Sequence, residues 1–183
     1  MHPKLQAILD EFASASTRLH ALSAQVPLEQ WPKRRNPERW SVAECVAHLN
    51  VTSEAFLPLL TAAVEQAQAM SSPPQVRYRR DVFGWLLWRT MGPPVRFAIA
   101  TPAAFVPAAD LPPATLLEEF DRLQTAQVDL LRAVDGKPIS EIHVASPFAP
   151  GRTYNLYSCF SILPRHQHRH LWQAEGIWKS ANT

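Results

Sequence analysis

Proline spacing is the feature of this sequence that most limits its fold. The chain has 183 residues and 17 prolines, eight of which lie between Pro73 and Pro113 while none lies between Pro113 and Pro138. Proline removes a backbone hydrogen bond and ends or kinks a helix. The clustering therefore divides the chain into helical segments and one long connector.

Four segments outside the proline-rich connector place apolar residues at the spacing of three and four that marks one helical face. Their expected ranges are residues 5–22, 41–64, 115–134 and 156–178. A short strand is expected at residues 142–145. Four amphipathic helices, with a long crossover between the second and the third, predict an all-α fold of the four-helix-bundle type.

Local signals place the helix ends. Ser41 and Glu44 have the spacing of a capping box, in which each side chain bonds the other residue's backbone N–H, and Thr115 and Glu118 repeat that spacing. Pro58 falls inside the second helical pattern, where it is expected to kink the helix or to split it.

The connector covers residues 71–114 and is unusually long for a small domain. Residues 81–91 are expected to form a short helix and residues 95–101 to be extended. Trp85 and Trp88 share one face of the short helix. They are expected to be core, to line a substrate pocket or to form a homodimer contact, and the helix is expected to cover one end of the bundle or to make a subunit contact.

Composition excludes several classes of protein. With 18 basic and 16 acidic side chains the formal charge is only +2, which does not favour nucleic-acid binding. No apolar run reaches the roughly 18 residues of a membrane helix, and no signal segment starts the sequence, so we expect a soluble cytoplasmic protein with a single domain over residues 1–183. Two cysteines, Cys45 and Cys159, exclude a disulfide scaffold and are expected to be buried small hydrophobes.

Three of the seven histidines, His166, His168 and His170, fall in one run of five residues inside the last helical segment. At about 100° per residue, His166 and His170 lie about 40° apart on the apolar face, whereas His168 lies nearly opposite. Two neutral imidazoles one turn apart can bind a single metal ion. We therefore expect His166 and His170 to face the core, His168 to be exposed and dispensable, and Arg169 to point outward or along a neighbouring helix.

A third ligand is most simply supplied by His48, at the edge of the apolar stripe of the second helix. The alternative is that His48 is a hydrogen-bonded core residue without a metal. His20 lacks an inward partner, His2 is terminal and expected to be mobile, and His143 lies in a loop near the expected strand.

These residues carry a resemblance to a known family. The run from Trp40 to His48, Trp-Ser-Val-Ala-Glu-Cys-Val-Ala-His, followed about 120 residues later by His166-Gln-His-Arg-His170-Leu-Trp-Gln173, resembles the DinB-like superfamily of four-helix bundles. In that family three histidines bind one divalent metal, most often zinc or nickel. The resemblance thus implies His48, His166 and His170 as the metal ligands.

The resemblance also implies a range of functions. Some relatives use a low-molecular-weight thiol to transfer or isomerise a small-molecule substrate, and others are hydrolases. We therefore expect a metal-dependent transferase or hydrolase. The alternatives are a non-catalytic metal-binding or ligand-sensing bundle, and a bundle that keeps the histidines as a polar network without metal. Gln173 would bond a ligand imidazole or a metal-bound water, or make a helix contact, and Pro164 is expected to bend the turn before His166.

Overall fold

A computed structural model describes residues 1–71, 77–94, 100–107 and 111–180. Its secondary-structure elements are five α-helices, two short 3-10 turns and one β-hairpin within those ranges. In chain order they are α1 (Pro3–Gln25), η1 (Leu28–Gln30), α2 (Val42–Ala69), α3 (Val82–Met91), η2 (Ala103–Phe105), α4 (Pro113–Arg132), β1 (His143–Ala145), β2 (Thr153–Asn155) and α5 (Leu156–Lys179).

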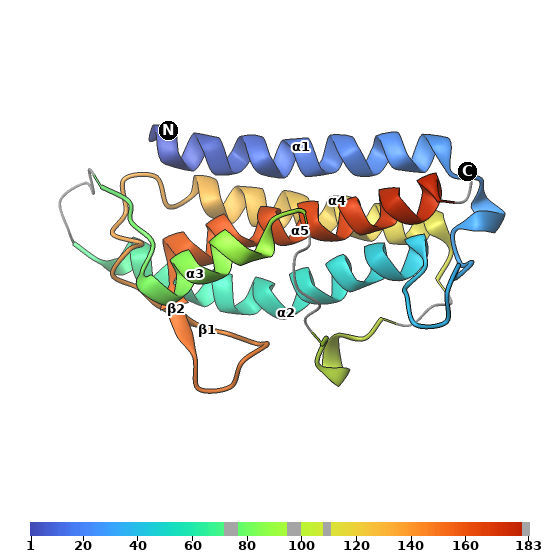
Figure 1. The fold of residues 1–183 in the computed structure, drawn as a ribbon. Helices are drawn as coiled ribbons and strands as arrows, with labels where there is room; N and C mark the ends of the chain where they lie inside the picture. The colour runs from blue at the N-terminus through green and yellow to red at the C-terminus, as the bar shows by residue number, and fades with distance from the viewer. Residues whose placement is uncertain (72–76, 95–99, 108–110, 181–183) are drawn as a thin grey trace.

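The long helices α1, α2, α4 and α5 form the bundle, which confirms the all-α fold. Helix α5 packs against α1 on one side and α2 on the other, and α4 packs against both α1 and α2. Figure 1 shows α3 alongside α5, where it adds a fifth, outer helix. Helix α5 is therefore covered by neighbouring helices on several sides along most of its length.

The long crossover follows from the direction of the helices. In Figure 1, α1 and α5 run one way along the bundle, whereas α2 and α4 both run the other way. The chain leaving α2 must therefore return along the bundle before α4 can begin. The crossover, which contains α3 and η2, makes that return.

The prolines within helices do not divide them. Helix α2 runs without a break through Pro58, and α5 runs through Pro164, so of the kink or split expected at Pro58 the split does not occur. Pro58 and Glu54, whose carbonyl would have accepted the missing N–H, both lie on the exposed side of α2. Water can solvate that carbonyl, which lowers the cost of the lost hydrogen bond.

The start of α4 corrects a second expectation. The helix begins at Pro113, its cap residue is Pro112, and no side chain caps it, so the capping box expected at Thr115 and Glu118 does not mark the helix start. Proline is favoured at the first helical position because its φ angle is already helical and its missing N–H would have no partner there. The helix therefore starts two residues early.

The connector contains the short helix expected at residues 81–91, but this helix does not cover an end of the bundle. Helix α3 lies along the side of α5 rather than over an end of the bundle (Figure 1). Its Trp88 ring lies against the guanidinium groups of Arg80 and Arg165, at 4.1 and 4.5 Å from the ring centre, whereas Trp85 is half exposed. The segment expected to be extended at residues 95–101 lies mostly outside the described residues.

The expected strand forms one half of a β-hairpin. Strand β1 pairs antiparallel with β2, with Val144 opposite Tyr154. Both of these side chains are buried, because alternate residues of a strand face the same side. The hairpin thereby closes the bundle near the start of α5.

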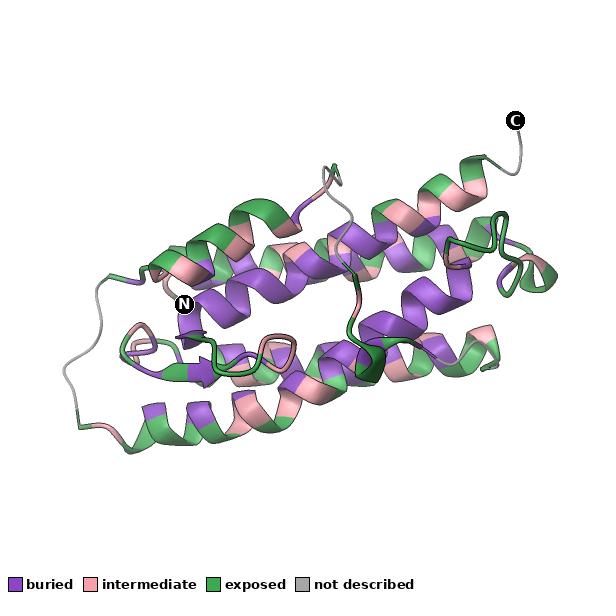
Figure 2. Cartoon of the chain, turned by 60° about the horizontal axis from the view of Figure 1, so that its bottom comes forward, coloured by how far each residue is buried: buried purple, intermediate pink, exposed green. Residues whose placement is uncertain are grey.

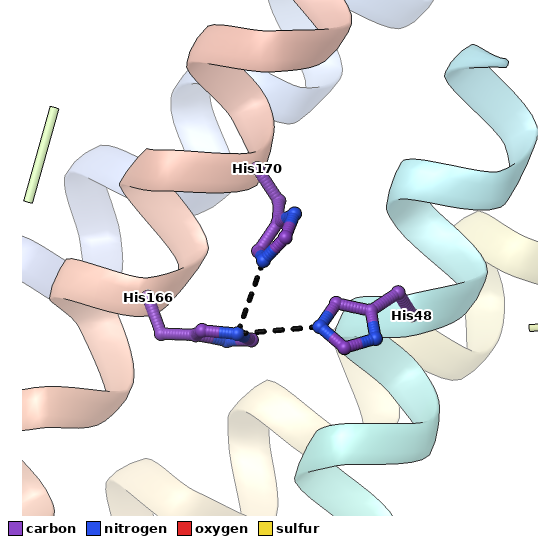
Figure 3. A group of neighbouring side chains, drawn as sticks. All are labelled: His48, His166 and His170. Atoms are coloured by element: carbon purple, nitrogen blue, oxygen red, sulfur yellow. Dashed lines mark hydrogen bonds between the residues drawn. The ribbon is translucent and has the colours of Figure 1, made fainter. Parts of the chain in front are cut away.

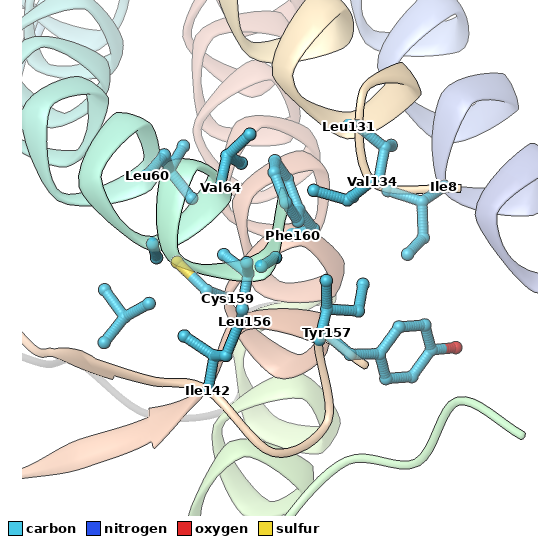
Figure 4. Packing of buried hydrophobic residues seen from close by; sticks show 14 of the residues in the cluster. Ile8, Leu60, Val64, Leu131, Val134, Ile142, Leu156, Tyr157, Cys159 and Phe160 are labelled. Atoms are coloured by element: carbon cyan, nitrogen blue, oxygen red, sulfur yellow. The ribbon is translucent and has the colours of Figure 1, made fainter. Parts of the chain in front are cut away.

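Two apolar clusters form the core. The hairpin-side cluster joins the first half of α1, the second half of α2, the end of α4, the hairpin and the first half of α5, and Figure 4 shows part of it around Phe160 and Leu60. The cap-side cluster joins the second half of α1, the start of α2, the first half of α4 and the second half of α5. In Figure 2 the buried faces of the helices line the interior of the bundle.

A polar layer lies between the two clusters. Its members are His48, His166 and His170 on one side, and Ser16, Gln124 and Gln167 on the other. The amide of Gln124 donates to Gln167 Oε1 at 3.1 Å, and that of Gln167 donates back to Gln124 Oε1 at 2.7 Å. The glutamines thus satisfy each other, as buried amides must.

None of the helices in the described ranges combines the length and the apolar character that crossing a lipid bilayer requires.

Candidate metal centre

The start of α2 is fixed by three polar side chains. The Ser41 hydroxyl accepts from the Glu44 backbone N–H at 3.2 Å, and the Glu44 carboxylate accepts from the Ser41 N–H at 2.7 Å, which confirms the predicted capping box. Arg34 also binds the Glu44 carboxylate, with Nε at 2.8 Å from Oε2. This hydrogen bond holds the pKa of Glu44 below its usual value. Glu44 therefore anchors the helix that carries His48.

One backbone carbonyl fixes the orientation of His48. Its Nδ1 lies 2.8 Å from the carbonyl oxygen of Phe105, in η2 of the crossover. A carbonyl can only accept, so Nδ1 carries the proton and Nε2 of a neutral ring keeps a free lone pair. This is the arrangement in which a histidine presents Nε2 to a metal.

The three predicted ligands converge. His48 Nε2 lies 3.3 Å from His166 Nε2, and His170 Nε2 lies 3.1 Å from the same atom. Figure 3 shows His166 and His170 one turn apart on α5, with His48 reaching toward them from α2. One ligand atom from each of the three residues lies within 4.8 Å of the other two.

Burial keeps these rings neutral. The pKa of His166 is lowered to about 3, first by burial and then by the charges of His48 and Arg169. Burial also lowers the pKa of His170 well below its usual value, and that of His48 below it. At neutral pH the triad therefore presents unprotonated nitrogens, the form that binds a metal.

The donor set fits a divalent ion. Two nitrogens that each bind zinc at about 2.0–2.1 Å with tetrahedral angles lie about 3.3 Å apart, close to the two separations measured from His166 Nε2. A single Nε2–H on His166 can donate to only one of its two neighbours, so hydrogen bonds alone do not satisfy all three nitrogens. An ion among them would bind all three lone pairs.

A large cavity opens over the triad. Its volume is about 1030 Å³, at the upper end of the roughly 300–1,000 Å³ of small-molecule sites. The Trp40 ring lines it and lies 4.8 Å from the His48 ring and 5.7 Å from the His170 ring. A small molecule in the cavity would therefore reach the nitrogens of the triad.

Comparison with known proteins identifies the family. A family model described as the DinB superfamily matches residues 11–174, a range that contains all three histidines of the triad. The chain belongs to the DinB superfamily. Among curated proteins and among solved structures, no significant match to the chain was found.

The other histidines of this DinB-superfamily chain lie away from the triad. His168 is half-buried rather than exposed, with Nδ1 at 2.8 Å from the Arg18 guanidinium, because α1 covers that side of α5. His2, expected to be mobile, caps α1 by accepting from the Lys4 N–H at 3.1 Å. His20 is exposed beside Asp121, and His143 is exposed on β1.

Two further residues of α5 belong to the site. Gln173 lines the cavity, and its side chain raises the pKa of His170, against the larger opposite effect of burial. Arg169 is buried and also lines the cavity, so of the two expected orientations, outward or along a neighbouring helix, the outward one is wrong. The sequence did not show this because Arg169 lies at the border of the apolar face, where burial depends on tertiary packing.

The cysteines behave as predicted. Both thiols are free and buried. Burial raises the pKa of Cys45 to about 12, and it raises the pKa of Cys159 as well. Cys45 lies on the cavity wall, but its thiol stays protonated at neutral pH and is a poor nucleophile.

Proposed function

We propose that this protein is a divalent-metal-dependent enzyme whose ligands are His48, His166 and His170, and that it acts as a thiol-dependent transferase or as a hydrolase. The observation that carries the proposal is the convergence of three neutral imidazoles at one wall of a cavity large enough for a small-molecule substrate. Three neutral ligands leave the charge of the ion uncompensated and at least one coordination position open.

The ion, when bound, supplies Lewis acidity that lowers the pKa of a water or thiol joining it. The protein contributes the rest. The Phe105 carbonyl holds the His48 ring with Nε2 toward the site. Burial keeps competing protons off His166 and His170. The Trp40 ring covers one side of the triad and limits the access of water.

We propose that the nucleophile is a thiol or water brought to the triad, because the described lining offers neither a thiolate nor a carboxylate pair. Cys45 is protonated at neutral pH, and among the described residues that line the cavity the only carboxylate is Glu38, which is exposed. A pair of carboxylates for general acid–base catalysis is thus missing from the described lining. A substrate thiol or a water activated at the triad fits this lining, which supports thiol transfer or hydrolysis.

Zinc and nickel are the metals we propose. Imidazole nitrogen suits both, along with copper and iron. The two separations from His166 Nε2, 3.3 and 3.1 Å, agree with zinc. The sparse set of acid–base groups favours, as a second candidate, a metal-containing bundle that binds a ligand without turning it over.

Two measurements test the proposal on the full chain. Elemental analysis after incubation with zinc or nickel at pH 8 should give one equivalent of metal in the wild-type protein and much less in His166→Ala. His168→Gln is the matched control and should keep its metal. A wild-type protein that takes up no metal would refute the proposal.

Turnover then separates the two candidates. The metal-loaded protein is assayed with a low-molecular-weight thiol and an electrophile such as 1-chloro-2,4-dinitrobenzene, and with ester substrates for hydrolysis. Activity lost in His166→Ala and kept in His168→Gln supports the enzyme. Stoichiometric metal without turnover in either assay supports the non-catalytic bundle.

A further inference from the structure

A buried cation lies beside the triad. Arg169 is 5 % exposed and lines the cavity one residue before His170. Its charge lowers the pKa of both His166 and His170, so its field reaches the imidazoles of the triad. A guanidinium keeps its proton at neutral pH even where burial lowers its pKa.

Among the described residues of the cavity lining, cations outnumber carboxylates. The charged residues among the described lining are Arg35, Arg39, Arg169 and Glu38. Three cations face one carboxylate, and a divalent ion at neutral histidines would add two further positive charges. A cavity lined by one sign of charge concentrates ligands of the opposite sign.

The remaining walls are mostly apolar and aromatic. Phe56 of α2, Leu87 of α3 and Phe148 of the hairpin loop face the cavity, together with Trp40. The Phe148 ring lies 6.1 Å from the His166 ring, so apolar surface extends up to the triad. Such walls bury the hydrocarbon or aromatic body of a ligand, while a few polar groups fix its orientation.

We propose that the site takes an amphipathic organic acid, with its carboxylate bound by Arg169 beside the triad and its apolar body against the aromatic walls. The inference rests on the proposed metal site and names its class of substrate. Arginine binds carboxylates through two parallel hydrogen bonds, which gives geometric selection as well as charge. The carboxylate would also offset the positive charge that Arg169 and the ion bring together.

The experiment compares acids with their neutral amides. Zinc-loaded full-length protein is titrated by calorimetry with 4-phenylbutyrate, 6-phenylhexanoate, the matching primary amides, and acetate. The phenylalkanoates should bind roughly tenfold or more tightly than their amides, the range of a hydrogen bond to a charged group. Acetate should bind far more weakly, because it has no apolar body.

Substitutions at two arginines of α5 assign the effect. Arg169→Gln should remove the preference for the acid, and Arg169→Lys should keep part of it, since lysine keeps the charge but loses the paired hydrogen bonds. Arg165→Gln is the matched control, because its guanidinium lies against Trp88 and outside the cavity lining. Melting curves confirm that each variant is folded.

Metal affinity gives a second readout. If the acid and the ion bind side by side with opposite charge, each raises the affinity of the other by the same factor. A chelator competition should show zinc held more tightly with 4-phenylbutyrate than with its amide in the wild-type protein. In Arg169→Gln that difference should disappear.

The outcomes are distinct from those of the proposed function. Equal binding of acids and amides, a preference that persists in Arg169→Gln, or no binding of any acid in the series would overturn the inference while zinc binding stands. The same titrations are run without zinc. If the protein takes up no metal, an Arg169-dependent preference for the acid still supports the carboxylate site, and its absence overturns it.

Discussion

The buried imidazoles of the triad couple the stability of the fold to pH. Each ring has a lower pKa in the folded protein than the value near 6.5 of an unfolded chain. As the pH falls below that value, the unfolded chain takes up protons that the folded protein refuses. The contribution of these neutral rings to the free energy of unfolding is therefore fully present above about pH 6.5 and is lost as the pH falls toward 3.

We expect metal-free protein to lose stability steeply between pH 6.5 and 5. For His166 alone, a pKa of about 3 in the folded state corresponds to a loss of about 2 kcal/mol at pH 5. Urea unfolding of chelator-treated protein at pH 8, 6.5 and 5 measures this. The matched variant His166→Gln should show a shallower loss, and equal pH dependence in both proteins would contradict the assignment of the effect to this ring.

The triad and His168 should differ sharply in metal affinity. Loss of a hydrogen bond behind a ligand costs roughly 10–100-fold in affinity, and loss of the ligand itself should cost more. Zinc affinity by chelator competition should therefore fall more than about 100-fold in His48→Ala and stay within a few-fold of wild type in His168→Gln. A comparable fall in His168→Gln would show that the Arg18 contact orients the site.

The sequence predicted which residues form the triad better than it predicted which helices cover the residues beside them. The helical phase of α5 correctly predicted that His166 and His170 face inward, and the family pattern supplied His48. The exposure predicted for His168 was wrong, as was the outward orientation that was one of two expected for Arg169, because both treat α5 as having one buried face. Helix α5 contacts α1, α2 and α3, so it is covered on several sides. How many sides of a helix are covered depends on tertiary packing, which the helical pattern of its own sequence does not show.

At the scale of elements, α3 approaches α5 most closely at Gly84 among the described glycines. A Cβ added at Gly84 would lie 2.2 Å from Ser158 Oγ and 2.3 Å from Ser158 Cβ on α5. The Asp81 side chain caps α3 at the Gly84 N–H and also reaches the Asn155 N–H at the start of α5. The absence of a side chain at residue 84 is thus what lets α3 lie flat against α5.

Gly84→Ala should lower stability by about 1–3 kcal/mol, the range for overfilling a packed contact, even though alanine favours helices. Thermal melting measures the loss. Gly176→Ala on α5 is the matched control, because nothing lies within 4 Å of its added Cβ, and it should not destabilise. In the double variant with Ser158→Gly, part of the loss from Gly84→Ala should be recovered, and strict additivity would contradict the contact.

Helices with strong periodicity were predictable and the crossover was not. The apolar patterns gave all four long helices to within a few residues. The contact between Phe105 and His48 joins residues 57 positions apart through a three-residue turn that has no periodic pattern. Strand β2 is equally short, and its pairing with β1 depends on where α5 starts.

At the scale of the whole molecule, the cavity extends along much of α5. Its lining runs from Ile162 of α5 to Ser180 directly after it and includes Leu163 of the hairpin-side cluster and Cys45 of the cap-side cluster, so it spans the level of the polar layer. The sequence predicted the bundle because each helix has one apolar face. It could not predict the cavity, whose walls come from α2, α3, α5, the loop before α2 and the hairpin loop.

We expect the two apolar clusters on either side of the polar layer to open separately. Each apolar cluster draws on parts of α1, α2, α4 and α5, and no member belongs to both. Units joined through few apolar contacts exchange their amide hydrogens with different opening free energies. An ion at the triad would bridge residues 118 positions apart in the chain and tie the two units together.

Hydrogen exchange followed by mass spectrometry should therefore show two levels of protection in chelator-treated protein. The cap-side unit, with the smaller cluster, should exchange faster than the hairpin-side unit. Zinc should slow amide exchange in the cap-side segments of α2 and α5, so that the two units reach the same level of protection and open together. Identical protection of the two units without metal would mean that the bundle is already fully cooperative, and that the ion serves the chemistry of the cavity without setting how the fold comes apart.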